Sequence, residues 1–506
     1  MTFIDNFLNR ITMYRLVLYY LAALYFLAII FAFFHFLPYS PLAMIFHLAF
    51  LLAVSWMTNE IFARYFKEPV NVESSYITAY ILALIITPLS PQQGISYLIF
   101  LLFAAIWSIA SKFLVAVKGK HIFNPAALSV FLTAILVNLS ASWWVGNAYL
   151  VIPVFLGGYL IVRKIRRWDM IISFFLFSFL AIFIPGILKG TAILAILTKA
   201  LFYSPLFFFA FIMLTEPLTT PSRKWGRIFY GALVGILFSP AIHFGSFYTT
   251  PEIALLLGNF FSYLISPKQK LILQLERIDL IGDDLFELVF SHRGKFKFRP
   301  GQYLEWTMAH NHPDRSGTRR YFTIASAPTE QEIRIGIKYN QGKSSYKRAL
   351  LSMKKGDKIF ASQLAGDFTL PKSRNKKLVF IAGGIGITPF RSMVKYIIDK
   401  NERRDIVLFY SCKLPEEITY KNIFDSAQNS GVKTVYTLTD KQAPEIPWCY
   451  RGRLDARIIE KEVPDYSERI FFISGPNTMV EAYKKMLHEL GINSSQIKTD
   501  YFPGFV

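Results

Sequence analysis

Cysteine and histidine are scarce in this chain, and their scarcity limits the cofactors that it can carry. Among 506 residues there are two cysteines, Cys412 and Cys449, and eight histidines. Two thiols cannot hold an iron–sulfur cluster with four cysteine ligands or a cysteine-based zinc ion. We therefore expect no metal site of either kind, and an electron carrier in this protein would be organic or a haem held by histidine.

Acidic residues are also few. The 34 Asp and Glu residues stand against 55 Lys and Arg residues, which gives a formal net charge of +21. Basic loops on the cytoplasmic side of a membrane, and a soluble domain beside anionic lipid, both account for such an excess. Because the basic residues are scattered and form no known nucleic-acid-binding motif, we predict no nucleic-acid partner.

Long hydrophobic runs fill the first half of the chain. Leu, Ile, Phe and Ala dominate residues 11–265, whereas residues 268–506 have the composition of a soluble protein. A bilayer core about 30 Å thick needs about 20 apolar residues of helix. We therefore predict about ten spans, some of them broken or tilted, over residues 12–35, 41–58, 75–88, 95–116, 126–139, 147–162, 169–185, 192–214, 227–243 and 252–265.

Basic residues in the loops predict the orientation. With the N-terminus inside, the outer loops carry only Lys189, and the inner loops carry Arg64, Lys67, Lys112, Lys118, Lys120, Arg163, Lys164, Arg166, Arg167, Arg223, Lys224 and Arg227. This asymmetry follows the positive-inside rule. It predicts a multi-pass protein of the cytoplasmic membrane, embedded in lipid, with the N-terminus and the second half in the cytosol. The first run is too long for a signal-peptide core.

Three polar motifs border the predicted spans. The stretch HIFNPAALS places Asn124 just before a span, TEPLTTPSRKWGR places Glu216 directly after one, and Glu73 lies at the start of another. Asn and Glu next to Pro are typical of helix caps and turns, so a purely structural role is one interpretation. The other is an ion or cofactor site, because an acidic residue at a membrane boundary can mark one.

The motifs FNPAALS and TEPLTTPSRKWGRIFYGALVGILF, together with the number of predicted spans, resemble the RnfD/NqrB family. These are the large membrane subunits of the Rnf and sodium-pumping NADH:quinone oxidoreductase complexes. The resemblance covers about half of the chain and implies a flavin in the membrane, near Asn124, Pro125, Glu216 and Thr219. Many members attach FMN to an S-G-A-T-like motif that this half lacks, so we expect non-covalent FMN or riboflavin.

Two strand patterns follow one another in the second half. Short alternating strands such as LFELVFSHR and EIRIGIKYN predict a small antiparallel barrel over residues 268–372. Strands that alternate with helices, from KLVFIAGG to NTMVEAYKKMLHELG, predict a doubly wound parallel sheet over residues 373–506. With a membrane domain over residues 1–265, the predicted fold class is multi-domain: a polytopic α-helical membrane domain, an antiparallel β-barrel FAD domain and an α/β nucleotide-binding domain.

Two stretches of this half carry chemistry suited to a flavin dinucleotide. In RRYFTIAS, alternation along a strand puts the cation of Arg320 and the ring of Phe322 on one face, followed by the hydroxyl of Thr323. A guanidinium suits a pyrophosphate, and an aromatic ring packs on an isoalloxazine. The stretch GKSS, from Gly342 to Ser345, opens a short helix whose free N–H groups can hold the same pyrophosphate.

Glycines 383, 384 and 386 follow a buried strand and precede Thr388 and Pro389. Glycine lets a backbone approach phosphate closely, and proline fits the first turn of a helix. A glycine cluster by itself is equally compatible with a plain tight turn.

Taken in order, FRPGQY, RYFTIAS, GKSS, GGIGITP, SGPNTM and YFPGF resemble the ferredoxin–NADP reductase superfamily over nearly the whole second half. The resemblance implies FAD and NAD(P)H as cofactors. It places FAD at Arg320, Phe322, Thr323, Gly342, Ser344 and Ser345, and the pyridine nucleotide at Gly383, Gly384, Gly386, Thr388, Gly475, Pro476 and Met479. The positions that it places at hydride transfer are Ser474 and Phe505.

Some positions depart from that superfamily. Phe322 stands where Tyr is usual and loses a hydroxyl, and Ser474 stands where many relatives have Cys near the hydride-transfer site. For the ribose 2′-position, Lys413 would favour a phosphate and Glu416 would repel one. The balance favours NADH.

Together, the two resemblances imply a membrane oxidoreductase. Electrons would pass from cytosolic NAD(P)H through FAD to a membrane flavin, and on to a quinone or an extracytoplasmic flavoprotein. One alternative is a haem-wired enzyme like the ferric reductases, which needs stacked histidine pairs that His35, His47, His121 and His243 do not obviously supply. The others are a redox-coupled Na⁺ or H⁺ transporter and a membrane anchor for a soluble reductase, although ten helices exceed what a tether needs.

Overall fold

The computed structural model describes residues 4, 8, 11–66, 72–88, 94–117, 120–245, 247–266, 270–292, 294, 296–310, 313–314, 317–339, 344–440 and 442–500. The chain divides into two compact units between Gln269 and Lys270. Each unit is described by itself.

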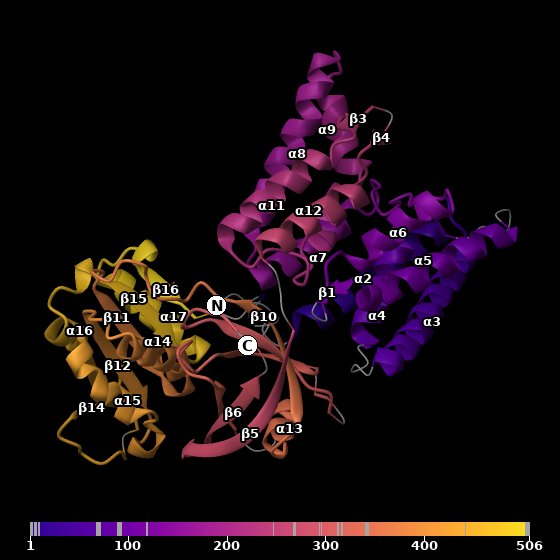
Figure 1. Cartoon of the computed structure of the whole chain (residues 1–506). Helices are drawn as coiled ribbons and strands as arrows, with labels where there is room; N and C mark the ends of the chain where they lie inside the picture. Colours follow the sequence, from indigo (N-terminus) through magenta and orange to yellow (C-terminus); the bar gives the residue numbers. More distant parts are fainter. Residues whose placement is uncertain are drawn as a thin grey trace. The chain divides into compact units, whose positions relative to one another are not determined.

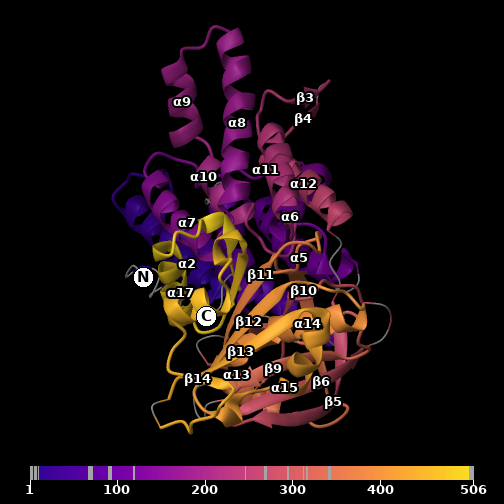
Figure 2. The ribbon, with the colours of Figure 1, turned by 90° about the vertical axis from the view of Figure 1, so that its left-hand side faces the viewer.

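The first unit is helical. Its helices are α2 (Met13–Phe33), α3 (Pro41–Phe66), α4 (Val72–Ile85), α5 (Gly94–Leu114), α6 (Pro125–Leu136), α7 (Val151–Ile165), α8 (Trp168–Leu188), α9 (Ile193–Phe202), α10 (Leu206–Phe208), the π-helix η2 (Phe209–Met213), α11 (Lys224–Leu237) and α12 (Pro251–Ile265). Two short hairpins, β1–β2 (Ala116–Val117, Lys120–His121) and β3–β4 (His243–Phe244, Phe247–Tyr248), join them. Helices α8 and α9 lie side by side (Figures 1 and 2).

Each of the ten predicted segments contains a helix, but ten spans are not confirmed. Four described helices, α2, α3, α5 and α8, are long and apolar enough to cross a membrane. The segment 192–214 is bent by 55° between α9 and α10, so it counts as a fifth span only as a broken one. Pro205 lies in that break, where it lacks an N–H and disfavours helix before it. Helices of 10–17 residues, among them α4, α6 and α12, are shorter than a bilayer needs.

Two glycines allow close packing between α8 and α11. A Cβ atom on Gly231 of α11 would lie 2.4 Å from the carbonyl oxygen of Met170 on α8, and one on Gly235 would lie 2.6 Å from that of Phe174. Glycines four residues apart on one helix face let two backbones touch, as in many membrane helix pairs. The pair α8–α11 therefore depends on the absence of side chains at these two positions.

The second unit begins with a six-stranded antiparallel sheet. Its strands are β5 (Leu271–Gly282), β6 (Leu285–His292), β7 (Tyr303–Thr307), β8 (Arg319–Thr323), β9 (Ile333–Lys338) and β10 (Lys358–Ala365), in the order β8-β7-β10-β5-β6-β9. Alternating apolar side chains fill its interior, with Trp306 and Phe290 the largest. The helix α13 (Ser345–Leu351) packs its Tyr346 and Leu350 into the same core.

A six-stranded parallel sheet follows. Its strands are β11 (Leu378–Gly383), β12 (Ile406–Cys412), β13 (Val432–Leu438), β14 (Cys449–Arg451), β15 (Ile470–Ser474) and β16 (Ile497–Thr499), in the order β14-β13-β12-β11-β15-β16. One face packs against α14 (Thr388–Asp399) and α15 (Lys421–Ser426), and the other against α16 (Ala456–Glu462) and α17 (Asn477–Glu489). The antiparallel sheet and the doubly wound sheet are the two folds that the sequence predicts for this half.

Candidate functional site

The strand order of the parallel sheet locates a binding edge. After β11 the chain adds β12, β13 and β14 on one side, and β15 and β16 on the other. Open α/β sheets bind ligands at such a switch point, outside the carboxyl ends of the strands. The register pairs Ala382 with Ser474 and Gly383 with Ser411, so the segments after β11 and β15 meet at this edge.

Glycines allow these two segments to touch. A Cβ atom on Gly386 would lie 2.4 Å from the carbonyl oxygen of Ser474, and one on Gly383 would lie 2.2 Å from the sulfur of Met479. Gly384 differs, because it has a φ of +52° and nothing within 4 Å of the place where a Cβ would be. Its backbone therefore faces open space, as a nucleotide-binding turn requires. The predicted nucleotide residues Gly475 and Pro476 lie in the same turn before α17.

The hydroxyl of Thr388, also predicted to meet the nucleotide, donates to the carbonyl oxygen of Ile385 at 3.2 Å. It therefore holds the turn η3 (Gly384–Ile387) onto the start of α14.

Asp500 joins the nucleotide edge to the predicted flavin strand, and no sequence motif indicated it. Its carboxyl oxygen Oδ2 accepts a hydrogen bond from Ser474 Oγ at 3.2 Å and from Thr323 Oγ1 at 3.5 Å. Burial raises the pKa of Asp500 to about 7, although both hydroxyls act against that rise. A carboxyl with a pKa this close to neutrality is a candidate for proton exchange. Its position directly after β16 is the signal that could have pointed to it.

Strand β8 presents a cation and a ring on one face, as alternation predicts. The guanidinium carbon of Arg320 lies 5.0 Å from the ring centre of Tyr346, and the ring of Phe322 lies 6.3 Å from it. On the opposite face, Tyr321 donates to Glu305 at 2.9 Å. Arg320 and Phe322 therefore share the face that α13 borders.

Arg320 holds a carboxylate in this structure. Its Nη2 donates to both oxygens of Asp314, at 2.8 and 3.1 Å. The backbone N–H of Ser345 donates to Asp314 Oδ2 at 3.0 Å. The carboxylate of Asp314 thus lies between Arg320 and Ser345, two of the predicted pyrophosphate ligands. The donors of these two residues converge on a space the size of one anionic group. Ser344, another predicted pyrophosphate ligand, accepts from the N–H of Lys347 at 3.3 Å and caps α13.

Two predicted residues, Gly342 and Phe505, lie outside the part of the chain that the structure describes.

A buried ion pair fixes the barrel against the parallel sheet. Arg391 of α14 bonds both carboxylate oxygens of Glu330, which lies between β8 and β9, and donates to the carbonyl oxygen of Ala325 at 3.1 Å. Ser392 adds a bond of 2.6 Å to the carbonyl oxygen of Ser326. Arg391 is 3% exposed, so this pair is shielded from water. These contacts form a seam between the loop that joins β8 to β9 and the first two turns of α14.

In the membrane unit, the predicted flavin residues form a closed network. Glu216 accepts hydrogen bonds from Asn124 Nδ2 at 2.9 Å and from Thr219 at 3.3 Å, and it pairs with His121 Nε2 at 3.0 Å. Asn259 joins this network through the N–H of Asn124. The cavity beside Thr219 and Asn259 measures about 20 Å³, which is room for one water. A flavin ring does not fit there, so the residues present do not fit that cofactor at this place.

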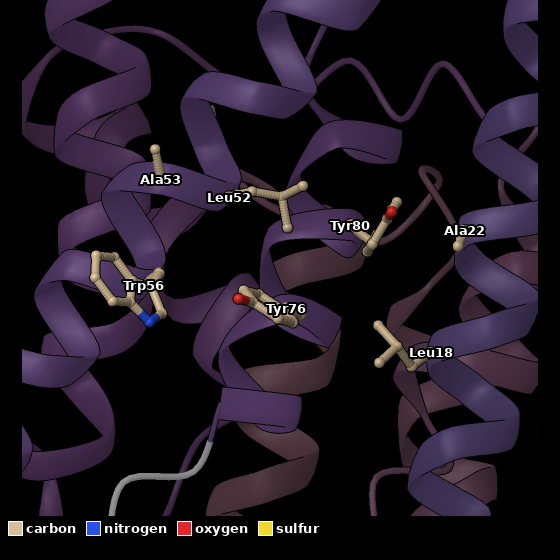
Figure 3. Close-up of a pocket in the computed structure, with 7 residues that line it drawn as sticks. All are labelled: Leu18, Ala22, Leu52, Ala53, Trp56, Tyr76 and Tyr80. Atoms are coloured by element: carbon tan, nitrogen blue, oxygen red, sulfur yellow. The ribbon is translucent and has the colours of Figure 1, made fainter.

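A larger groove lies elsewhere in the same unit. It measures about 410 Å³ and is lined by side chains of α2, α3 and α4: Leu18, Ala22, Leu52, Ala53, Trp56, Tyr76 and Tyr80. Figure 3 shows the hydroxyl of Tyr76 directed toward Trp56, with Leu18 and Ala22 on a separate helix. Aromatic faces with few polar groups suit a flat, largely apolar ring.

Helix α3 also buries polar side-chain atoms that have no hydrogen-bond partner among the described residues. Among the described residues, neither ring nitrogen of His47 has a hydrogen-bond partner, and the same holds for Ser55 Oγ and Asn59 Nδ2. His47 and Ser55 are fully buried, and Asn59 is 4% exposed. Residues 47, 51, 55 and 59 recur every four positions, so these three groups share one face of α3.

The other membrane histidines do not pair with His47. His35 and His243 are exposed, and His121 bonds Glu216. A haem held between two buried histidines needs two such ligands. Of these four residues, His47 could supply one, and none of the others could supply the second. Glu73, an acidic candidate from the sequence, pairs with Arg15 at 2.9 Å.

Comparison with known proteins supports a two-part chain. Residues 135–270 match the model of the NQR2, RnfD, RnfE family, and residues 380–485 match that of the oxidoreductase NAD-binding domain. The first half thus resembles the RnfD/NqrB membrane subunits, and the second half the ferredoxin–NADP reductase superfamily. Each match covers less than half of the chain.

Individual relatives align with the second half. The glycine betaine monooxygenase reductase subunit of Pseudomonas aeruginosa is 28% identical over 210 residues, 41% of this chain and 57% of that protein. The Na(+)-translocating NADH-quinone reductase of Yersinia pestis has a subunit that is 33% identical over 171 residues, 32% of this chain and 40% of that subunit. The chain therefore spans about half the length of these relatives.

Among solved structures, the FAD/NAD-binding domain of the nitric oxide dioxygenase of Vibrio cholerae is similar over 46% of this chain and 98% of that one, at 20% identity and a TM-score of 0.40.

Proposed function

We propose that the protein is a membrane oxidoreductase that takes electrons from NAD(P)H and passes them through FAD into its membrane unit. The observation that carries the proposal is the Thr323–Asp500–Ser474 contact. It brings the strand with the flavin-binding pattern to the edge with the nucleotide-binding glycines. A nicotinamide at that edge and an isoalloxazine beside Phe322 would then meet at these two hydroxyls.

The residues have distinct tasks in this proposal. Bound FAD supplies the ability to accept a hydride and release electrons singly. Arg320 and Ser345 hold its pyrophosphate, and Phe322 packs on its ring. Gly384 and Gly386 allow the nucleotide close to the backbone, while Asp500 orients the hydroxyls of Thr323 and Ser474. The Arg391–Glu330 pair keeps the two binding faces in register.

The charges near the carboxyl ends of β12 and β13 favour NADH. Lys413 and Glu416 both follow β12 and are both exposed, and their opposite charges would have opposite effects on a 2′-phosphate. Asp440 follows β13 by two residues and is partly exposed. An acidic side chain at the end of such a strand favours a free ribose 2′-hydroxyl and repels a 2′-phosphate. We therefore propose NADH as the preferred donor.

The aromatic groove on α2, α3 and α4 is the proposed acceptor site. Its rings and aliphatic side chains suit the head group of a quinone dissolved in the bilayer. The alternative acceptor is an extracytoplasmic flavoprotein. A non-covalent membrane flavin stays a prediction, and the small volume of the cavity beside Thr219 favours another place for it. The cytoplasmic membrane and a cytosolic second half stay predictions as well.

An absorption spectrum of the detergent-purified protein, before and after anaerobic NADH, tests the proposal. We expect a flavin spectrum that bleaches on NADH addition, and we expect Arg320→Ala to lose it. A protein that contains no flavin, or an Arg320→Ala variant that still passes NADH electrons to an acceptor, contradicts the FAD assignment. A haem band that shifts on reduction supports the histidine-based alternative instead.

The polar face of α3 favours proton coupling as a second candidate. Buried groups without partners are costly, and in membrane helices they often belong to proton or ion paths. His47, Ser55 and Asn59 would form such a path through α3. In proteoliposomes, NADH-driven turnover should then acidify or alkalise the lumen, and His47→Leu should abolish that change while electron transfer persists. Turnover without proton movement contradicts this candidate.

A further inference from the structure

The proposed pyrophosphate site is filled by a carboxylate of the chain itself. Asp314 precedes β8 and places both oxygens on Arg320 Nη2, at 2.8 and 3.1 Å. Its Oδ2 also accepts the backbone N–H of Ser345 at 3.0 Å. In return, the N–H of Asp314 donates to Ser345 Oγ at 2.8 Å, so the two residues hold one another through two hydrogen bonds.

These contacts are those that a phosphate would make. A guanidinium N–H binds a carboxylate oxygen or a phosphate oxygen by the same kind of charge-assisted bond, and here one nitrogen, Nη2, contacts both oxygens of Asp314. His310 Nε2 lies 3.0 Å from Ser345 Oγ and holds that hydroxyl in place from the other side. Asp314 therefore occupies the donors in the geometry in which an anionic ligand would need them.

Both anions cannot use this site at once. Arg320 is 13% exposed at its side chain, and its second amino group donates to the carbonyl oxygens of Arg319 and Gly317 at 2.7 and 3.1 Å. One terminal nitrogen is thus committed to the backbone and the other to Asp314. A pyrophosphate beside the Asp314 carboxylate would also meet a like charge in a partly desolvated place.

Lys347 lies in the same neighbourhood. Burial and the nearby charge of Arg320 lower the pKa of its ammonium group, and its Nζ donates to the carbonyl oxygen of Lys338 at 2.7 Å. The positive charge of Arg320 thus acts on Lys347, so an anion held by Arg320 lies in a positively charged neighbourhood.

We propose that Asp314 is an internal competitor for FAD: it holds the pyrophosphate donors in their binding arrangement and leaves Arg320 when the cofactor arrives. This inference rests on the proposed function, because it assumes that FAD binds at β8. It makes cofactor loading an exchange of one anion for another. The affinity for FAD is then lower than it would be if Arg320 and Ser345 had no internal partner. In return, Asp314 keeps these two donors in their binding arrangement until FAD arrives.

The variant Asp314→Asn tests the exchange. It keeps the size of the side chain and an oxygen for the Ser345 N–H, but it removes the charge that competes with pyrophosphate. In the full-length, deflavinated protein, FAD titration followed by flavin fluorescence should show a dissociation constant about 10-fold lower than in the wild type, a change of about 1.4 kcal/mol. Asp314→Glu, which keeps the charge, should bind FAD as the wild type does.

Riboflavin separates competition from a general structural effect. It has the same ring as FAD but no phosphate, so Asp314→Asn should leave its affinity unchanged. Asp283→Asn, in the exposed turn between β5 and β6, is the matched control and should change neither affinity. Equal FAD affinity in wild type and Asp314→Asn overturns the inference, as does equal tightening for riboflavin. A wild-type protein that binds no FAD overturns the proposed function and this inference together.

Discussion

Replacing Asp500 by Asn should change how the stability of the protein depends on pH. The folded chain raises the pKa of this carboxyl from its usual value near 3.8 to about 7, because burial disfavours the charged form. Folding then requires uptake of a proton at any pH between these two values. The contribution of Asp500 to stability is therefore fully present below about pH 3.8 and is lost as pH rises through 7.

The size of the effect follows from the shift. About three pKa units at about 1.4 kcal/mol each correspond to about 4 kcal/mol above pH 7. Asp500 keeps partial access to solvent, and water screening reduces this to about 2 kcal/mol. Asn has no charge to bury, and its oxygen can still accept from Ser474 and Thr323. For a unit of this length, about 2 kcal/mol moves the melting temperature by about 4–8 °C.

Melting curves of the full-length protein at pH 4, 6 and 8 provide the assay. The variant should melt higher than the wild type at pH 8, and the two should melt together at pH 4, where both side chains are neutral in the folded protein. Asp283→Asn serves as an exposed control. Parallel melting temperatures for wild type and Asp500→Asn across this range would refute the assignment of a raised pKa to this residue. The rate of flavin reduction by NADH should also lose a pH dependence centred near 7.

Three further substitutions test other parts of the structure. Glu330→Gln leaves Arg391 charged and buried, so the melting temperature should fall by an amount that corresponds to about 3–5 kcal/mol of stability. The control Glu481→Gln, on the surface, should lower the stability by less than about 1 kcal/mol. Equal losses of stability in the two variants would contradict a structural role for the Arg391–Glu330 seam. Gly386→Ala forces a Cβ against Ser474, so NADH should reduce FAD more slowly while FAD content stays constant, and an unchanged rate would contradict the close approach. Ala53→Trp should fill the groove and raise the KM for a soluble quinone about 10-fold, while the NADH-ferricyanide activity stays unchanged. The control Leu156→Trp, on the exposed side of α7, should change neither the KM nor that activity.

Local patterns predicted the second half well because each depends on neighbours along the chain. Alternation along β8 placed Arg320 and Phe322 on one face, and both do contact Tyr346. The change from strand-turn to strand-helix patterns predicts two different sheets, and the structure has an antiparallel sheet followed by a parallel one. Hydropathy alone also found a helix in every predicted segment of the first unit, but it could not fix their lengths. A helix of 14 residues, such as α4, is about 21 Å long, which leaves a bilayer about 30 Å thick uncrossed.

Contacts between distant residues could not be predicted in the same way. Asp500 meets Ser474 across 26 positions and Thr323 across 177. The register of β15 with β16 brings Asp500 beside Ser474, and the packing of the antiparallel sheet against the parallel sheet brings Thr323 to them. The contacts of the Asp314 carboxylate could not be predicted for the same reason, because they depend on where α13 begins in space. A sequence shows which residues can bind an anion, but it does not show whether another residue of the chain already does.

The same reasoning applies to the membrane unit. The sequence placed Asn124, Glu216 and Thr219 together as a flavin site, and the structure does bring them together. Their donors and acceptors, however, satisfy one another and His121, and the space beside them holds one water. Among the described residues, buried polar atoms without a hydrogen-bond partner gather instead on α3, at His47, Ser55 and Asn59 Nδ2, with Ser178 Oγ of α8 as a further one. Because unsatisfied buried groups are the costly ones, a search for a ligand or proton path in this unit is better begun at α3 than at the motif that carries the family resemblance.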